Sequence, residues 1–257
     1  MRTNGQRDTV PSAHQKLYID KAYFKSYLVD GFDVVKFPVR WTTGQWVGAT
    51  IMAGTTVFLF SVDGHIQGWA QSNRTPALDQ LSKYLFEPIG SGLYSLSAMG
   101  ILYGCGLISK DDRAKITALK GVEAFILSGI TSQIIKQLTH RHRPYQDDPP
   151  DPFMWDGPFH GFTNTSFPSG HSATAFAIAA VVATSYQETI WVPILCYTLA
   201  TGTALSRIYD NDHWASDVLA GSVIGFGIGQ LVVHNESRLK VIPVSPTGAG
   251  ISLVYQF

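Results

Sequence analysis

Long stretches without a charged residue dominate this chain and limit the folds that are open to it. No Asp, Glu, Lys or Arg lies between Arg40 and Asp63, or between Glu87 and Lys110. Each of these stretches is as long as the roughly 20 apolar residues with which a helix crosses a bilayer. Four further runs follow, some of them shorter. We therefore predict six helices, over residues 42–62, 88–109, 124–135, 172–187, 189–206 and 218–233.

Two classes of protein contain such helices: integral membrane proteins, and soluble all-α domains with buried core helices. Short apolar runs fit either class, because length alone does not separate them. Charged residues make up 15% of the chain, whereas soluble domains contain roughly 25%. We predict an all-α fold with a six-helix bundle core that is embedded in a membrane, and a soluble bundle is the alternative.

The distribution of basic residues predicts how such a bundle is oriented. With six alternating spans, the N-terminal tail, residues 110–120 and the C-terminal tail share one side. They carry thirteen Lys or Arg, against six on the other side. Since cytoplasmic loops are enriched in basic residues, the first side is expected in the cytoplasm. The other side is expected to face the periplasm or the exterior.

Composition excludes one class of partner and sets the domain boundaries. The 19 basic residues balance the 19 acidic ones, so the basic surface of a nucleic-acid-binding protein is not expected. Residues 1–40 form a polar N-terminal lead, in which residues 18–39 either lie against the membrane or pack on the bundle. Residues 41–236 form the helical domain. Residues 237–257 form a tail that ends in a strand-like alternation.

The two cysteines and the N-terminal residues do not indicate the cellular compartment. Cys105 and Cys196 both lie in apolar runs, so we interpret them as buried side chains rather than as a disulfide framework. Residues 1–15 are polar and lack the apolar segment of a signal peptide. Either the protein has no such peptide, or the peptide was removed.

Three polar clusters interrupt the apolar C-terminal half, each at the end of a predicted helix. In an up-down bundle, the third helix ends beside the start of the fourth, level with the end of the fifth and the start of the sixth. Helix order alone therefore brings the clusters to one end of the bundle. The clusters are Lys136 with Arg143-Pro144, Pro168-Ser169-Gly170-His171, and Ser206-Arg207 with His213 and Asp217.

Five of these residues suit the binding of a tetrahedral oxyanion. The planar guanidinium groups of Arg143 and Arg207 can each bind two oxygens, and Lys136 adds a point charge. Ser169 offers a hydroxyl group. Gly170 allows the backbone N–H groups at a helix start to approach an anion closely. We predict that these residues bind a phosphate group.

The two histidines divide into a nucleophile and an acid. His213 and Asp217 are four residues apart at a helix start, so they lie on one face. A carboxylate beside one ring nitrogen fixes the tautomer and stabilises the cation formed on attack. His213 is therefore the candidate nucleophile, through a phosphohistidine, and His171 the candidate acid for the leaving oxygen. Fixed cations and amides can stabilise the developing charge, so no metal or other cofactor is expected.

Together the clusters strongly resemble the signature of the type 2 phosphatidic acid phosphatase superfamily, K-x6-R-P, P-S-G-H and S-R-x5-H-x3-D. Every fixed position is matched between residues 136 and 217. The resemblance implies a six-helix core and metal-independent hydrolysis of phosphate esters. It also implies His213 as nucleophile supported by Asp217, His171 as acid, and the other five residues as phosphate ligands.

That family contains membrane phosphatases of lipid phosphates and diphosphates, soluble periplasmic acid phosphatases and vanadium haloperoxidases, whose pocket holds vanadate. We expect a cell-envelope phosphatase of lipid-linked phosphate monoesters or diphosphates, with its site facing the periplasm or exterior. A soluble periplasmic phosphatase acting on small-molecule esters of broad range, and a vanadium haloperoxidase, are the alternatives. Undecaprenyl diphosphate, phosphatidylglycerol phosphate, phosphatidate and lipid A all fit the expected substrate class, and the oligomeric state is left open.

Overall fold

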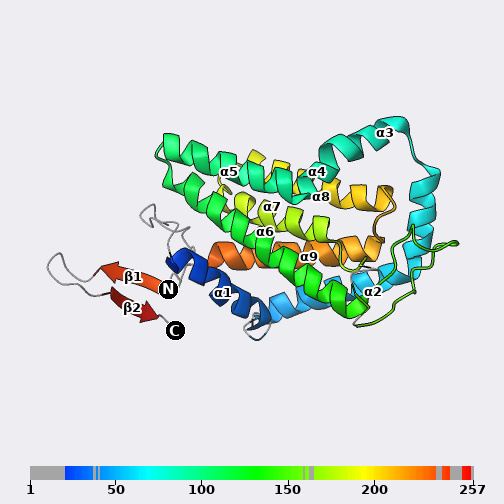
Figure 1. Ribbon diagram of the computed structural model, residues 1–257, viewed down its shortest axis with the longest axis horizontal. Coiled ribbons are helices and arrows are strands. Elements are labelled where there is room, and N and C mark those ends of the chain that lie inside the picture. Colours follow the sequence, from blue (N-terminus) through cyan, green and yellow to red (C-terminus); the bar gives the residue numbers. More distant parts are fainter. Residues whose placement is uncertain are drawn as a thin grey trace, which may run out of the picture.

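The computed structural model describes residues 21–36, 39, 41–158, 160–161, 165–235, 239–243 and 251–255. These residues form a bundle of helices and one pair of strands (Figure 1). A π-helical segment, Ser82–Phe86, joins the helix that ends at Leu81 to the helix that begins at Glu87. The helices are α1 (Lys21–Lys36), α2 (Thr43–Ser72), α3 (Pro76–Leu81), α4 (Glu87–Gly90), α5 (Gly92–Ile108), α6 (Asp112–Thr139), α7 (Gly170–Ser185), α8 (Trp191–Tyr209) and α9 (Ala215–His234).

All six predicted helices are present, as α2, α4 with α5, α6, α7, α8 and α9. Two of them, α2 and α6, extend at least ten residues beyond the uncharged runs that predicted them. The α6 helix starts at Asp112, where Asp111 caps it by accepting hydrogen bonds from the N–H groups of Arg113 and Ala114. The α2 helix continues past Asp63, which is buried inside the protein. A charged residue therefore does not have to end a helix. It can lie inside the helix if another part of the bundle pairs with its charge.

The α7 helix lies in the middle of the bundle and packs against α6, α8 and α9 (Figure 1). Its alanines, among them Ala173 and Ala177, are buried. Opposite them on α9 lie Gly225 and Gly229, where an added Cβ would come within 2.0 Å of the Ala173 carbonyl oxygen and 2.5 Å of the Ala177 carbonyl oxygen. Small residues on both helices therefore allow the two backbones to approach closely.

Three helices, α2, α6 and α9, are long and apolar enough to cross a membrane. The segments Pro76–Gly90 and Gly92–Ile108, bent by 62° against each other, would make a fourth span if counted together. Only Asp63 and Ala70 are buried in α2, whereas large side chains such as Ile51, Phe58 and Trp69 are exposed. Such a surface is typical of a helix in contact with lipid. The protein thus has the apolar helices of an integral membrane protein.

Segments from both ends of the chain are also ordered. The α1 helix, in the N-terminal lead, packs on the bundle, because the Tyr23 hydroxyl donates to the Leu119 carbonyl at 3.1 Å. The Ser26 hydroxyl likewise donates to Glu123 at 3.0 Å. At the other end, β1 (Leu239–Pro243) pairs antiparallel with β2 (Ile251–Tyr255), so the strand-like alternation does form a strand over residues 251–255.

Candidate active site

The three polar clusters lie together at the end of the bundle where α6 and α8 end and α7 and α9 begin (the right side of Figure 1). A backbone hydrogen bond joins the second cluster to the third, because the Ser169 N–H donates to the Asp217 carbonyl at 2.9 Å, and within the third cluster the His213 N–H donates to the Arg207 carbonyl at 3.1 Å. The expectation from helix order is therefore met in space. The start of α7 rests directly on the first turn of α9.

His213 lies just before α9 and its residue surface is only 3% exposed. Its Nδ1 lies 3.7 Å from Asp217 Oδ2, longer than a hydrogen bond, although catalytic hydrogen bonds commonly shorten when substrate binds. Burial lowers the pKa of His213 to about 3, with Lys136 and Arg143 adding to the effect and Asp217 opposing it. The imidazole is therefore neutral near neutral pH, which is the form that can act as a nucleophile.

Asp217 is completely buried and its carboxylate is held on both oxygens. Oδ2 accepts a hydrogen bond from the Ser166 hydroxyl at 2.5 Å and another from the Trp214 N–H at 3.0 Å. Oδ1 accepts a hydrogen bond from Arg141 at 2.6 Å. The Ser166 hydroxyl also lies 3.4 Å from His213 Nδ1. The carboxylate is thus fixed beside the imidazole rather than free to rotate.

Lys136 and the start of α7 form one wall of the site. Lys136 lies in the last turn of α6 and is buried. Its ammonium group donates to the carbonyl groups of Thr165 and Ser166. An added Cβ at Gly170 would lie 3.9 Å from Lys136 Cε, so the lysine side chain reaches the helix start. The Ser169 hydroxyl caps α7 by accepting from the Ser172 N–H at 3.4 Å, and a hydroxyl that accepts can still donate to another ligand.

His171 lies in the first turn of α7, against α4. A Cβ added at Gly90 would come within 2.7 Å of His171 Cδ2. Glycine at this position therefore lets the backbone of α4 approach the imidazole. The ring of the candidate acid is confined by the protein on that side.

The two arginines that were predicted to bind phosphate both contact Asp212. Arg207 is buried, and its Nη1 lies 3.1 Å from Asp212 Oδ2. Arg143 Nη1 lies 3.7 Å from Asp212 Oδ1. The Asp210 carboxylate also pairs with Arg207, at 2.5 Å. We call Lys136, Arg143 and Arg207 the cation cluster. The Asp212 carboxylate lies between the two guanidinium groups, where a bound phosphate would also lie.

The loop that carries Arg143 is held by a histidine between two carboxylates. His142 Nδ1 lies 3.0 Å from Asp147, and Nε2 lies 3.3 Å from Asp156. Burial acts to lower the pKa of His142, but the two carboxylates outweigh it and raise the pKa above its usual value. Through its two ring nitrogens, His142 therefore ties together residues 142–156.

Sequence reasoning missed several buried polar residues around Asp217. Arg141 was counted only as a basic residue, and Asp63 only as the end of an apolar run. Ser166 and Asp212 lie between fixed motif positions and carry no pattern of their own. One signal was available for Asp63, because it is the single Asp, Glu, Lys or Arg in α2. A lone charge within an apolar span usually has a buried partner and a function.

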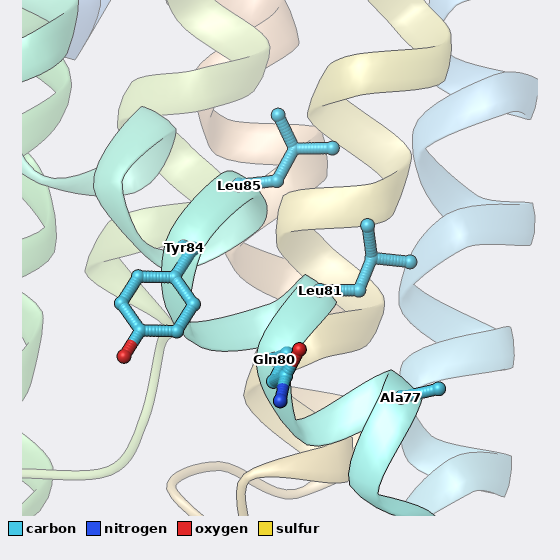
Figure 2. A pocket seen from close by; sticks show the side chains of 5 residues that line it. All are labelled: Ala77, Gln80, Leu81, Tyr84 and Leu85. Carbon is cyan, nitrogen blue, oxygen red and sulfur yellow. The ribbon is translucent and has the colours of Figure 1, made fainter.

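A shallow groove lies on the part of the chain that precedes α4. Figure 2 shows it on α3 and the π-helical segment, lined by Ala77, Gln80, Leu81, Tyr84 and Leu85. The same segment contains Ser82, whose hydroxyl donates to Asp210 Oδ2 at 2.6 Å. Since Asp210 pairs with Arg207, the groove is linked to the cation cluster through two polar contacts.

The solved structure of a transmembrane PAP2 type phosphatidylglycerolphosphate phosphatase from Bacillus subtilis has a similar fold. The TM-score is 0.54 at 21% sequence identity, covering 85% of this chain and 96% of that one. At this level of identity the similarity concerns the fold alone.

Sequence comparisons point to one family. A lipid A 1-phosphatase of Porphyromonas gingivalis is 46% identical over 72 residues, which are 28% of this chain but only 16% of that protein. A decaprenylphosphoryl-5-phosphoribose phosphatase of Mycobacterium tuberculosis is 31% identical over 132 residues, 51% of this chain and 68% of that protein. The model of the PAP2 superfamily matches residues 117–240, which include all three polar clusters. The chain therefore belongs to the PAP2 superfamily.

Proposed function

We propose that this protein is a metal-independent phosphatase that hydrolyses phosphate monoesters or diphosphates of lipids in a cell-envelope membrane. The observation that carries the proposal is a buried, neutral imidazole, His213, beside a fixed carboxylate and next to the cation cluster. A neutral imidazole is a nucleophile, and the cation cluster suits a phosphate group. The carboxylate stabilises the imidazolium that forms on attack.

The first chemical step transfers the phosphoryl group to the protein. The substrate phosphate binds Arg143 and Arg207 in place of the Asp212 carboxylate. His213 attacks phosphorus through Nε2, so a nitrogen–phosphorus bond forms and the bond from phosphorus to the leaving oxygen breaks. His171, which must be protonated while the anionic substrate is bound beside it, gives that proton to the leaving oxygen. The cation cluster stabilises the charge that spreads over the phosphoryl oxygens.

The second step returns the protein to its starting state. Water attacks the phosphohistidine while His171, now neutral, takes a proton from the water. The nitrogen–phosphorus bond breaks and His213 recovers its neutral form. Inorganic phosphate then leaves, and Asp212 pairs with the arginines again. Both steps use side chains of this chain, and neither requires a metal ion.

A lipid substrate fits the surroundings of the site. The exposed side chains of α2 suit contact with acyl chains, and the groove of Figure 2 lies on the segment whose Ser82 hydroxyl donates to Asp210. The two curated relatives above are named for lipid-linked phosphates. The basic residues of the tails favour a cytoplasmic position for the tails and a periplasmic or exterior position for the site.

The test is phosphate release by the full chain, purified in detergent, from lipid phosphates, lipid diphosphates and a water-soluble ester. We expect lipid substrates to be hydrolysed, a chelator to have little effect, and His213→Ala to abolish turnover without changing the melting temperature. The matched control is His234→Ala at the far end of α9, where the histidine is exposed. Activity that survives in His213→Ala, or inactivation by a chelator that a metal ion reverses, would overturn the proposal.

A further inference from the structure

Arg141 is completely buried behind the candidate site, and all five of its N–H donors are used. Its Nε donates to the Pro152 carbonyl at 3.0 Å, and Nη2 donates to the same carbonyl at 2.7 Å and to Asp63 Oδ2 at 2.8 Å. Its Nη1 donates to the Ser216 hydroxyl at 2.7 Å and to Asp217 Oδ1 at 2.6 Å. This geometry fixes the guanidinium group between two carboxylates.

Aromatic rings surround the same guanidinium group. Its central carbon lies 4.8 Å from the ring centre of Phe60, 4.9 Å from that of Trp155 and 5.4 Å from that of Trp214. Cations are attracted to aromatic faces, and the attraction is stronger away from water. The rings and the five hydrogen bonds together offset the cost of burying the charge.

Asp63 holds the other side of Arg141. Its side chain is completely buried, and its Oδ1 accepts a hydrogen bond from the Ser216 N–H at 3.0 Å. Its Oδ2 accepts from Arg141 and from the Ser216 hydroxyl. Asp63 therefore contacts both Arg141 and Ser216, which lies in the first turn of α9 directly before Asp217.

The charges of these groups have a consequence for the reaction. With Asp63 and Asp217 ionised and Arg141 cationic, the group carries one excess negative charge while His213 is neutral. When His213 becomes an imidazolium, that charge is neutralised. Without Asp63, Arg141 would instead cancel the charge of Asp217, and the imidazolium would lose its compensation in a site where charge is poorly screened.

We propose that Asp63 and Arg141 are positioning residues for the reaction of His213: they fix the Asp217 carboxylate beside Nδ1 and leave its negative charge available to the imidazolium. This inference rests on the proposed phosphatase function. In a purely structural role, the ion pair would only attach α2 to the bundle. Its loss would then weaken turnover and phosphate binding together, whereas a positioning role predicts a loss of turnover alone.

The test measures kcat and phosphate binding in the same variants. Asp63→Asn keeps the shape and removes the charge, while Arg141→Lys keeps the charge and removes the planar fork. We expect kcat to fall about 10- to 100-fold in each, as for residues that orient a metal ligand. The inhibition constant of inorganic phosphate should stay within about twofold of wild type, since the cation cluster is untouched. Asp79→Asn is the matched control, because Asp79 is an exposed carboxylate paired with Arg74.

Two outcomes would contradict the positioning role. A folded variant with wild-type kcat overturns the inference. So does a loss of kcat that comes with an equal loss of phosphate binding and a lower melting temperature in both variants. If Asp63→Asn does not fold, Arg141→Lys carries the test on the same terms. If the wild type releases no phosphate from any substrate, the proposed function fails instead, which separates that failure from this one.

Discussion

Asp212 lies between the two arginines that are proposed to bind phosphate, so removing its charge should tighten phosphate binding. Its carboxylate lies 3.1 Å from Arg207 Nη1 and 3.7 Å from Arg143 Nη1. A phosphate group that uses both guanidinium groups must displace this carboxylate. Asp212→Asn removes the competing charge and keeps the size of the side chain.

The size of the effect follows from the exposure of the pair. The Asp212 side chain is 32% exposed, and ion pairs in contact with water contribute about 0.2–1 kcal/mol each. The contact with Arg143 is long, so the two contacts together amount to about 1 kcal/mol. That free energy corresponds to a decrease of about fivefold in the inhibition constant of inorganic phosphate.

The assay is competitive inhibition of phosphate release by inorganic phosphate, at low and at high salt. We expect the difference between Asp212→Asn and wild type to shrink at high salt, because exposed charges are screened. Asp79→Asn, which changes an exposed carboxylate outside the cation cluster, should leave the inhibition constant unchanged. An inhibition constant that is equal or higher in Asp212→Asn would refute the idea that Asp212 competes with phosphate.

Two further predictions concern stability. Gly225→Ala should lower the free energy of unfolding by about 1–3 kcal/mol or more, because the new Cβ would lie 2.0 Å from the Ala173 carbonyl oxygen. Gly227→Ala on the same helix, where an added Cβ meets nothing within 4 Å, is the control, and equal thermal melts in detergent would contradict the prediction. Burial lowers the pKa of His213 from its usual 6.5 to about 3, so between these values the unfolded chain binds a proton that the folded protein does not. The contribution of this group to stability is therefore complete above about pH 6.5 and is lost as the pH falls; a melting temperature that falls as steeply in His213→Asn as in wild type would speak against it.

The order of the helices and the meeting of the motifs were predictable, because both depend on features that are local in the sequence. Apolar runs mark helices, and an up-down bundle leaves few ways to arrange their ends. The environment of each motif residue was not predictable, since it depends on partners that are far apart in the chain. Asp63 lies in α2 and Asp217 in α9, far apart in the sequence, and only the folded bundle brings Arg141 between them.

The role of Asp212 was also not predictable from the sequence. It lies beside His213, the proposed nucleophile, in a stretch of sequence that the motif leaves unspecified. Its importance comes from its distances to Arg143 and Arg207, which belong to different helix ends. Motif spacing indicates which residues bind a ligand, whereas the competing groups nearby become visible only with side-chain geometry.

The α2 helix offers most of its length to the acyl chains and holds the interior through Asp63 and Ala70. Lipid-facing helices change their tilt when the hydrocarbon layer becomes thicker or thinner. A tilt of α2 would displace Asp63, and Asp63 is bonded to the Arg141 guanidinium group that also binds the Asp217 carboxylate. We therefore expect the composition of the surrounding membrane to affect turnover, and vesicles of graded acyl-chain length should give graded values of kcat.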